Sequence, residues 1–249
     1  MEKIAIISDV HGCYISLQAV LADIEKRNIK RIFMIGDLVA KGSQPAETID
    51  LIRQKCEVVI KGNCDDIVGE KGTTKEHFWN KEKIGKDRQE YLASLPLYRD
   101  FYMSGLKVRL LHASASSMYN SISIYDITEN INKEIEDMFI EIDGIAPDVV
   151  IFGHIHSPFM YRLNNKMLIN AGSVSNSCDL ITKNNVTNLM ASYLIIEGEY
   201  NSKEAANISY ELVKVPFDYE KEIDNLKNSD MPNKDMAIQE IITGVYKAR

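Results

Sequence analysis

Two side chains that bind divalent metals follow the first apolar stretch of the chain. Residues 3–8 have the pattern of a short buried strand, and Asp9 and His11 come directly after it. If residues 9–12 form a turn, the carboxylate and the imidazole can converge on one point. Oxygen and nitrogen donors in this spacing suit a borderline ion such as Mn²⁺, Zn²⁺ or Fe²⁺. An aspartate at a strand-to-helix turn can equally cap a helix, so this pair alone leaves both interpretations open.

Further donors of the same kind stand after the later apolar stretches. They are Asp37, Asn63, Cys64, Asp65, His112, His154 and His156. Four of the five histidines, all but His77, fall at the ends of predicted strands, a distribution that unrelated core histidines would not have. Because parallel strands collect ligands outside their carboxyl ends, we expect these side chains to meet at one edge of a sheet.

The elements that must position these donors alternate between strand and helix at the start of the chain. Apolar runs predict strands over 31–35 and 56–60, and helical spacing predicts helices over 14–28 and 46–54. Three successive strand–helix units predict a parallel sheet. Later elements are hairpins over 97–111 and 159–169, a helix over 127–142, strands over 149–152, 193–196 and 208–215, and helices over 219–228 and 234–247.

The stretch 66–94 is polar and weakly helical, and it contains the only tryptophan, Trp79, next to Phe78. We interpret it as a surface insertion whose aromatic side chains pack on the rest of the molecule. The alternative is a helical cap over the site.

The chain of 249 residues with 45% hydrophobic content can bury a sizeable core, and we expect residues 1–249 to form one domain.

Composition limits the partners and the compartment. A net charge of −7 argues against a nucleic-acid-binding surface, because phosphate neutralisation needs an excess of Lys and Arg. No apolar run approaches membrane-spanning length and no secretory leader is evident, so we expect a soluble cytoplasmic protein. The four cysteines form no C-x-x-C pair, which indicates neither a disulfide framework nor a structural zinc site. A homo-oligomer is left open.

Five blocks in this order resemble the calcineurin-like metallophosphoesterase superfamily, and more narrowly its small bacterial and archaeal phosphodiesterase branch with Cys after the Asn. The blocks are Asp9-x-His11, Gly36-Asp37, Gly62-Asn63-Cys64-Asp65, His112 and Gly153-His154-x-His156. The resemblance spans residues 8–173. It implies an α/β fold, a four-layer α-β-β-α sandwich of two mixed sheets flanked by helices, with the metal site at the strand ends.

The resemblance also implies two divalent ions, with manganese first and iron, zinc, nickel or magnesium as alternatives. It assigns Asp9, His11 and His156 to the first metal, Asn63, His112 and His154 to the second, and Asp37 to both. Ions ~3.5–4 Å apart can share a hydroxide as nucleophile and each bind a phosphoryl oxygen, so the implied reaction is phosphate-ester hydrolysis by a metal-bridging hydroxide. Its implied catalytic residues are Asp37, Asn63, Cys64, Asp65 and His112.

Cys64 departs from the commoner family pattern, in which a histidine at this position resembles a general acid for the leaving oxygen and the following acid orients it. Here Asp65 is kept without that histidine. A thiol with a pKa near ~8.5 is a poor proton donor unless its surroundings tune it. We therefore predict a preference for leaving groups that need little protonation, such as those of aryl esters or phosphoanhydrides.

Three functions fit these residues. The first is a phosphoesterase for a small phosphate-ester or nucleotide substrate, acting on phosphodiesters with good leaving groups. The second is a dinucleoside polyphosphate hydrolase in which Trp79, Phe78 or Tyr119 stacks a base. The third, of a different class, is a non-catalytic protein-binding scaffold on the same fold. Retention of all seven implied ligands favours an enzyme over the scaffold.

Overall fold

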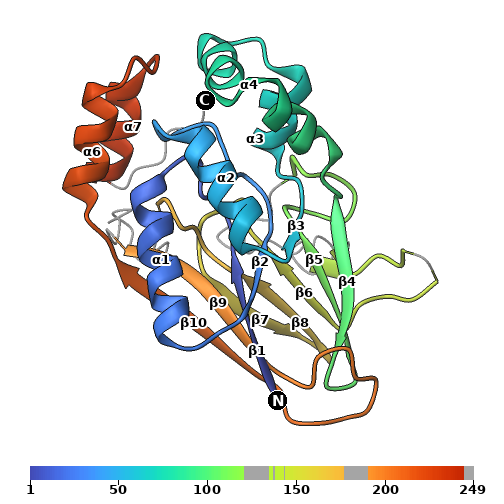
Figure 1. The fold of residues 1–249 in the computed structure, drawn as a ribbon. Helices are drawn as coiled ribbons and strands as arrows, with labels where there is room; N and C mark the ends of the chain where they lie inside the picture. The colour runs from blue at the N-terminus through green and yellow to red at the C-terminus, as the bar shows by residue number, and fades with distance from the viewer. Residues whose placement is uncertain (121–134, 137, 143, 177–189, 244–249) are drawn as a thin grey trace.

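The computed structural model describes residues 1–120, 135–136, 138–142, 144–176 and 190–243. Strands and helices alternate at the start of the chain, as the apolar periodicity predicts (Figure 1). In chain order the elements are β1 (Glu2–Ile7), α1 (Tyr14–Lys26), β2 (Arg31–Met34), α2 (Pro45–Lys55), β3 (Val58–Val59), α3 (Asn63–Asp66), η1 (Ile67–Lys71), α4 (Lys75–Ser94), β4 (Tyr98–Met103), β5 (Leu106–Leu111), β6 (Val149–Phe152), β7 (Phe159–Leu163), β8 (Lys166–Asn170), β9 (Met190–Gly198), β10 (Ser209–Pro216), α6 (Tyr219–Asn228) and α7 (Lys234–Thr243).

The strands form two mixed five-stranded sheets flanked by helices. The first has the order β10-β9-β1-β2-β3 and the second β4-β5-β6-β8-β7. In the first sheet β1, β2 and β3 are parallel, while β9 lies between β1 and β10 and pairs antiparallel with both. In the second sheet β5, β6 and β8 are parallel, and β4 and β7 lie antiparallel at the edges. The expected sandwich of two mixed sheets is therefore confirmed, and so is the parallel arrangement of the first three strands.

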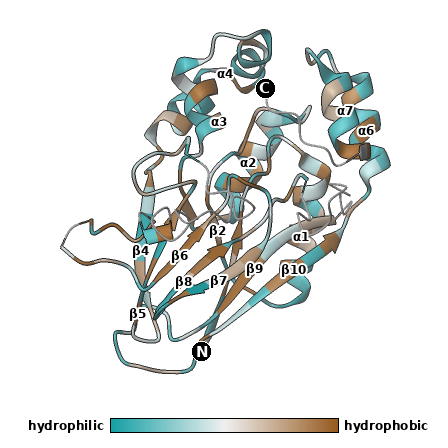
Figure 2. Cartoon of the chain, turned by 180° about the vertical axis from the view of Figure 1, so that it is seen from behind, coloured by the Kyte–Doolittle hydropathy of each residue, from teal (hydrophilic) through white to brown (hydrophobic). Residues whose placement is uncertain are grey.

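Successive side chains along each strand point to opposite faces of the sheet and so pack in different layers of the core. In β1, Ile4 and Ile6 pack between the two sheets, whereas Ala5 and Ile7 pack against the helices. In β6, Ile151 faces the space between the sheets and its neighbours face the outer side of the second sheet. Figure 2 shows the hydrophobic colouring concentrated on the strands and hydrophilic colouring over much of α4. Both sheets therefore bury both faces.

The expected hairpins are present, with residues in the left-handed region at their turns. Ser104 has a φ of 51° and Asn164 a φ of 53°, values that suit tight two-residue turns. The strand expected over 193–196 is longer, because β9 pairs with β1 on one side and with β10 on the other.

The helix expected over 127–142 and the end of the last helix lie largely outside the described residues. None of the helices in the described ranges is long and apolar enough to cross a membrane.

The insertion between β3 and β4 packs on the C-terminal helices through Trp79. This side chain is buried with Leu226 and Ile238 of α6 and α7, and its Nε1–H donates to Asp230 at 2.9 Å. The expected packing role is correct for Trp79, and with only 8% of the residue exposed the side chain offers little surface on which a substrate base could stack. Phe78 by contrast is 59% exposed.

Candidate functional site

Carboxyl ends of strands from both sheets meet at one place. Turns after β1, β2 and β3 carry donors from the first sheet, and turns after β5 and β6 carry donors from the second. The side chains brought together there are Asp9, His11, Asp37, Asn63, His112, His154 and His156. All seven expected ligands therefore lie in one cluster, on the side where ligands of α/β sheets collect.

The backbone at these turns is left-handed. The φ angle is 55° at Asp9, 54° at His11, 60° at Asp37, 66° at His154 and 58° at His156. Such conformations cost about 1–3 kcal/mol each for residues with a side chain, and they persist where the surrounding structure fixes them. Each turn aims its side chain back over the strand end and into the cluster.

Asp65 fixes the turn that carries Asp37. Its buried carboxylate accepts hydrogen bonds from the backbone N–H groups of Asp37, Leu38 and Gly62 at 2.8–2.9 Å. Burial, together with the charge of Asp37, raises the pKa of Asp65 to about 7, although the backbone donors oppose the shift. Asp65 therefore acts on the site through Asp37. A side chain at Gly62 would overlap the Asp37 carboxylate, so only glycine permits this approach.

One half of the cluster is formed by Asp9, His11 and His156. Asp9 Oδ1 lies 3.2 Å from His156 Nε2 and 3.7 Å from His11 Nε2, and the two imidazole nitrogens are 3.0 Å apart. Asp9 Oδ1 is buried and accepts no hydrogen bond of good geometry from the described residues. Buried oxygens are normally satisfied, so a buried carboxylate oxygen without a hydrogen bond, beside two imidazole nitrogens, indicates a cation site.

The other half is formed by Asn63, His112 and His154. Asn63 Oδ1 lies 2.9 Å from both His112 Nε2 and His154 Nδ1. Asp37 lies between the halves. Its Oδ1 is 3.4 Å from His112 Nε2 and its Oδ2 is 3.7 Å from His11 Nε2. One carboxylate oxygen therefore faces each half.

Outer hydrogen bonds fix which nitrogen each ring presents. Nδ1–H of His11 donates to the Val39 carbonyl at 3.1 Å, and Nδ1–H of His112 donates to the Ile35 carbonyl at 2.9 Å. Nδ1 of His156 lies 2.7 Å from Asn176 Oδ1. Each ring thereby turns Nε2 toward the cluster, as metal-binding histidines generally do.

Two hydrogen-bond partners of the expected ligands, Ser8 and Asn176, have no signal in the sequence pattern. Ser8 Oγ–H donates to Asp9 Oδ2 at 2.6 Å, and Asn176 holds His156. Ser8 directly precedes the first donor, and the apolar pattern indicates only that it belongs to the predicted strand. Asn176 follows the Gly172-Ser173 turn, and nothing in its spacing from His156 indicates the contact.

The charges of the carboxylates in the cluster suit a bound cation at neutral pH, and His112 releases a proton when a metal replaces it. Burial would lower the pKa of His112, but the carboxylates of Asp37 and Asp9 outweigh it and raise the pKa to about 10. Burial and the charge of His112 lower the pKa of His154 to about 4. The imidazoles hold the pKa values of Asp9 and Asp37 below their usual range despite burial. Two carboxylates are thus ionised, and the proton on His112 occupies a position that a divalent cation could take.

Cys64 lies at the edge of the cluster. Its backbone N–H donates to Asp37 Oδ1 at 2.8 Å, and its sulfur lies within reach of donor atoms of His11 and Asp37. Burial, and then the charge of Asp37, raises the pKa of the thiol well above its usual range. A thiol that keeps its proton so firmly is a weak general acid.

Taken together, the donor set fits divalent metals. Carboxylate, amide and imidazole donors occur together, and the unpaired Asp9 Oδ1 faces the same point as two imidazole nitrogens. This mixture suits Mn²⁺, Fe²⁺ or Zn²⁺ better than the all-oxygen sites typical of Ca²⁺.

Comparison with known proteins gives consistent matches. A calcineurin-like phosphoesterase superfamily domain matches residues 2–193. An uncharacterized protein of Methanocaldococcus jannaschii is 30% identical over 250 residues, covering 90% of this chain and 93% of that protein. A metallophosphoesterase from Sphaerobacter thermophilus has a TM-score of 0.74 at 21% identity, covering 98% of this chain and 99% of its own. A hypothetical protein from Pyrococcus horikoshii has a TM-score of 0.74 at 16% identity, and the match covers 99% of this chain and 100% of that protein.

Proposed function

The chain belongs to the calcineurin-like phosphoesterase superfamily, and on that premise we propose that it is a metal-dependent phosphoesterase acting on phosphodiesters with good leaving groups. The observation that carries the proposal is the convergence of carboxylate, amide and imidazole donors from both sheets on one buried place. The buried Asp9 Oδ1, which accepts no hydrogen bond from the described residues and lies beside two imidazoles, also supports a cation at this place.

In this proposal the donors hold two divalent cations, manganese first. The two ligand sets are Asp9, His11 and His156, and Asn63, His112 and His154. Asp37 bridges the sets, which its geometry supports because one oxygen faces His11 and the other faces His112. When bound, the cations supply hydroxide at neutral pH and offset charge on the phosphoryl oxygens.

The chain's own residues supply orientation. Asp65 holds the Asp37 turn through three backbone N–H groups, and Asn176 orients the ring of His156. Misplacement of reacting groups by about 1 Å can cost about a hundredfold in rate, so these contacts act directly on turnover. Because Cys64 is a weak acid, the leaving oxygen departs with little protonation help, which favours aryl or phosphoanhydride leaving groups.

Hydrolysis of bis(4-nitrophenyl) phosphate with added Mn²⁺ tests the proposal. We expect turnover by the wild-type protein and loss of at least about a hundredfold in Asp37→Asn, since an amide offers only one oxygen for two cations. Manganese binding without turnover on aryl diesters, aryl monoesters and nucleoside anhydrides would instead support the non-catalytic scaffold.

A further inference from the structure

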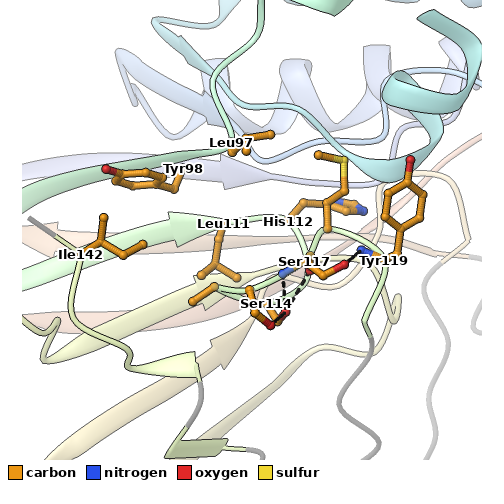
Figure 3. A pocket seen from close by; sticks show the side chains of 11 residues that line it. Leu97, Tyr98, Leu111, His112, Ser114, Ser117, Tyr119 and Ile142 are labelled. Atoms are coloured by element: carbon orange, nitrogen blue, oxygen red, sulfur yellow. Dashed lines mark hydrogen bonds between the residues drawn. The ribbon is translucent and has the colours of Figure 1, made fainter. Parts of the chain in front are cut away.

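A largely apolar pocket of about 290 Å³ opens beside His112 (Figure 3). It lies between the start of β4, the end of β5 and the loop that follows β5. Leu97, Leu111, Met118 and Ile142 line it. Its size is close to the lower end of the range of about 300–1,000 Å³ for small-molecule sites, so it fits one ring system rather than a whole dinucleotide.

The pocket carries little charge. Apart from His112, none of its lining residues is ionised at neutral pH. The serine turn in its wall is internally bonded, because Ser114 Oγ–H donates to the Ser117 carbonyl at 2.8 Å and Ser114 Oγ accepts from the Ser117 N–H at 3.1 Å. The pocket therefore suits an uncharged group with a large apolar face.

Tyr119 joins this pocket to the candidate metal site. Its hydroxyl donates to Asp66 Oδ2 at 2.5 Å, and Asp66 also accepts from Lys71 Nζ at 2.6 Å. Lys71 Nζ lies 5.6 Å from the centre of the Tyr119 ring, within the range of a cation–π contact. Asp66 ends α3, which begins at the candidate ligand Asn63. The ring is thus held at the pocket wall by the segment that also supplies a metal ligand.

We propose that this pocket binds a flat, uncharged ring carried by the phosphoester substrate, an aryl group or a nucleobase, while the phosphate lies at the neighbouring donor cluster. The inference rests on the proposed function, because it assigns the organic part of the same substrate. Three observations support it: His112 lines both sites, the remaining walls are apolar or uncharged, and a firmly held aromatic ring stands at the wall.

Binding of two phosphonates to the manganese-loaded protein tests the pocket without turnover, since neither contains a hydrolysable ester bond. We expect phenylphosphonate to bind about tenfold more tightly than methylphosphonate in calorimetric titrations. Leu97→Asp should remove this preference by placing a charge at the pocket wall. Leu97 is 57% exposed, so the change should leave folding intact. Met160→Asp is the matched control, because Met160 is 41% exposed on β7 and does not line the pocket.

A third probe distinguishes the two sources of the ring. If the natural ring is a nucleobase, the methylenephosphonate analogue of adenosine 5′-monophosphate should bind more tightly than phenylphosphonate and lose affinity in Leu97→Asp. Weaker binding of this analogue with the phenyl preference retained indicates an aryl group.

Two results would overturn the inference: equal binding of phenyl- and methylphosphonate by the wild-type protein, or an unchanged preference in Leu97→Asp. A ring preference without hydrolysis of any ester would overturn the proposed function alone. Hydrolysis without a ring preference would overturn the pocket assignment alone.

Discussion

At the scale of single residues, two hydrogen bonds hold the carboxylate of Asp9 in one orientation. Its Oδ2 accepts from Ser8 Oγ–H at 2.6 Å and from the His154 backbone N–H at 2.9 Å, which leaves Oδ1 facing His11 and His156. A side chain at Gly153 would overlap Ser8, so the second sheet can approach this carboxylate only through glycine. The carboxylate is therefore preorganised before any ion binds.

Asp9→Ala tests whether this carboxylate is a ligand of the first metal ion. We expect one of two manganese ions to be lost and diester hydrolysis to fall by at least about a hundredfold, because the first set then keeps only two imidazoles of its own. Elemental analysis of the dialysed protein and initial rates check both effects. Ser8→Ala is the control, since it removes one orienting hydrogen bond and should keep both ions with a loss of about tenfold. Survival of both ions and full activity in Asp9→Ala would refute the assignment.

The firmly protonated thiol of Cys64 predicts how the hydrolysis rate depends on the leaving group. With chemistry limiting, rates of wild-type hydrolysis should fall steeply as the leaving group becomes more basic, because the thiol gives little protonation. Cys64→His should flatten this dependence by adding an imidazole donor at the same position. A series of substituted phenyl and alkyl diesters measures the slope, with Cys56→Ala, a partly buried thiol packed in the helical core, as the control. Equal wild-type rates for aryl and alkyl leaving groups would exclude this role of Cys64.

At the scale of elements, α4 depends on the C-terminal helices. Trp79 is buried at their contact, and Lys83 Nζ pairs with Asp230 at 3.0 Å beside it. Figure 1 places α4 and the α6–α7 pair at the same end of the sandwich. The contact is formed by segments about 150 positions apart in the sequence.

Trp79→Ala should lower the free energy of unfolding by about 3 kcal/mol, through lost burial and the cavity left behind. Chemical denaturation followed by circular dichroism measures the loss. Phe78→Ala removes an exposed aromatic one residue away and should change stability by less than about 0.5 kcal/mol. Equal losses in the two variants would mean that Trp79 does not hold α4 in place.

The start of α1, just after the first donors, is held by a residue from the end of the chain. Cys13 at the helix N-cap makes no side-chain capping bond, and Glu222 of α6 instead accepts from the Ile15 N–H at 3.0 Å. Burial raises the pKa of Glu222 from 4.5 to about 7, against the lowering effect of the backbone donors.

This raised pKa gives a pH dependence of fixed sign. The folded state keeps the Glu222 proton to higher pH than the unfolded state does. The stability that the protonated Glu222 side chain contributes to the fold is therefore complete below pH 4.5 and is lost as the pH rises to about 7. Relative to Glu222→Gln, the wild-type protein should lose up to about 3 kcal/mol of unfolding free energy across this window. Denaturation at a series of pH values measures the difference, and Glu220→Gln, an exposed neighbour, is the control. A constant difference between wild type and Glu222→Gln would contradict the shift.

Sequence periodicity predicted the elements better than their partners. The apolar runs ending at Asp9 and Asp37 predicted β1 and β2, because a buried parallel strand needs an unbroken apolar run. The order of the candidate metal-binding motifs predicted the cluster by resemblance to a family. The contact of Trp79 with α6 and the cap from Glu222 were not predicted, because both join segments far apart in the chain without a local pattern. Tertiary packing alone determines such contacts.

At the scale of the whole molecule, the candidate site joins the two sheets. Asp9 and Asp37 come from the first sheet, while His112, His154 and His156 come from the second. Between these ends the sheets are held by the apolar layer that contains Ile6 and Ile151, whereas at the site itself they face each other with ionised and polar groups. Burial of such groups without a compensating cation lowers stability locally.

Metal binding should therefore stabilise the whole fold. An ion that binds only the folded state adds about 2.7 kcal/mol at a hundred times its Kd, so saturating Mn²⁺ should raise Tm by several degrees. Calorimetry of the chelator-treated protein with and without Mn²⁺ measures the gain, and Ca²⁺ at equal ionic strength is the control, because it prefers oxygen-only sites. Asp37→Asn should lose more of this gain than Asp9→Ala, because Asp37 faces both ligand sets and Asp9 only one. Equal gains in all three proteins would mean that Mn²⁺ binds elsewhere, and the cluster would then join the sheets through hydrogen bonds alone.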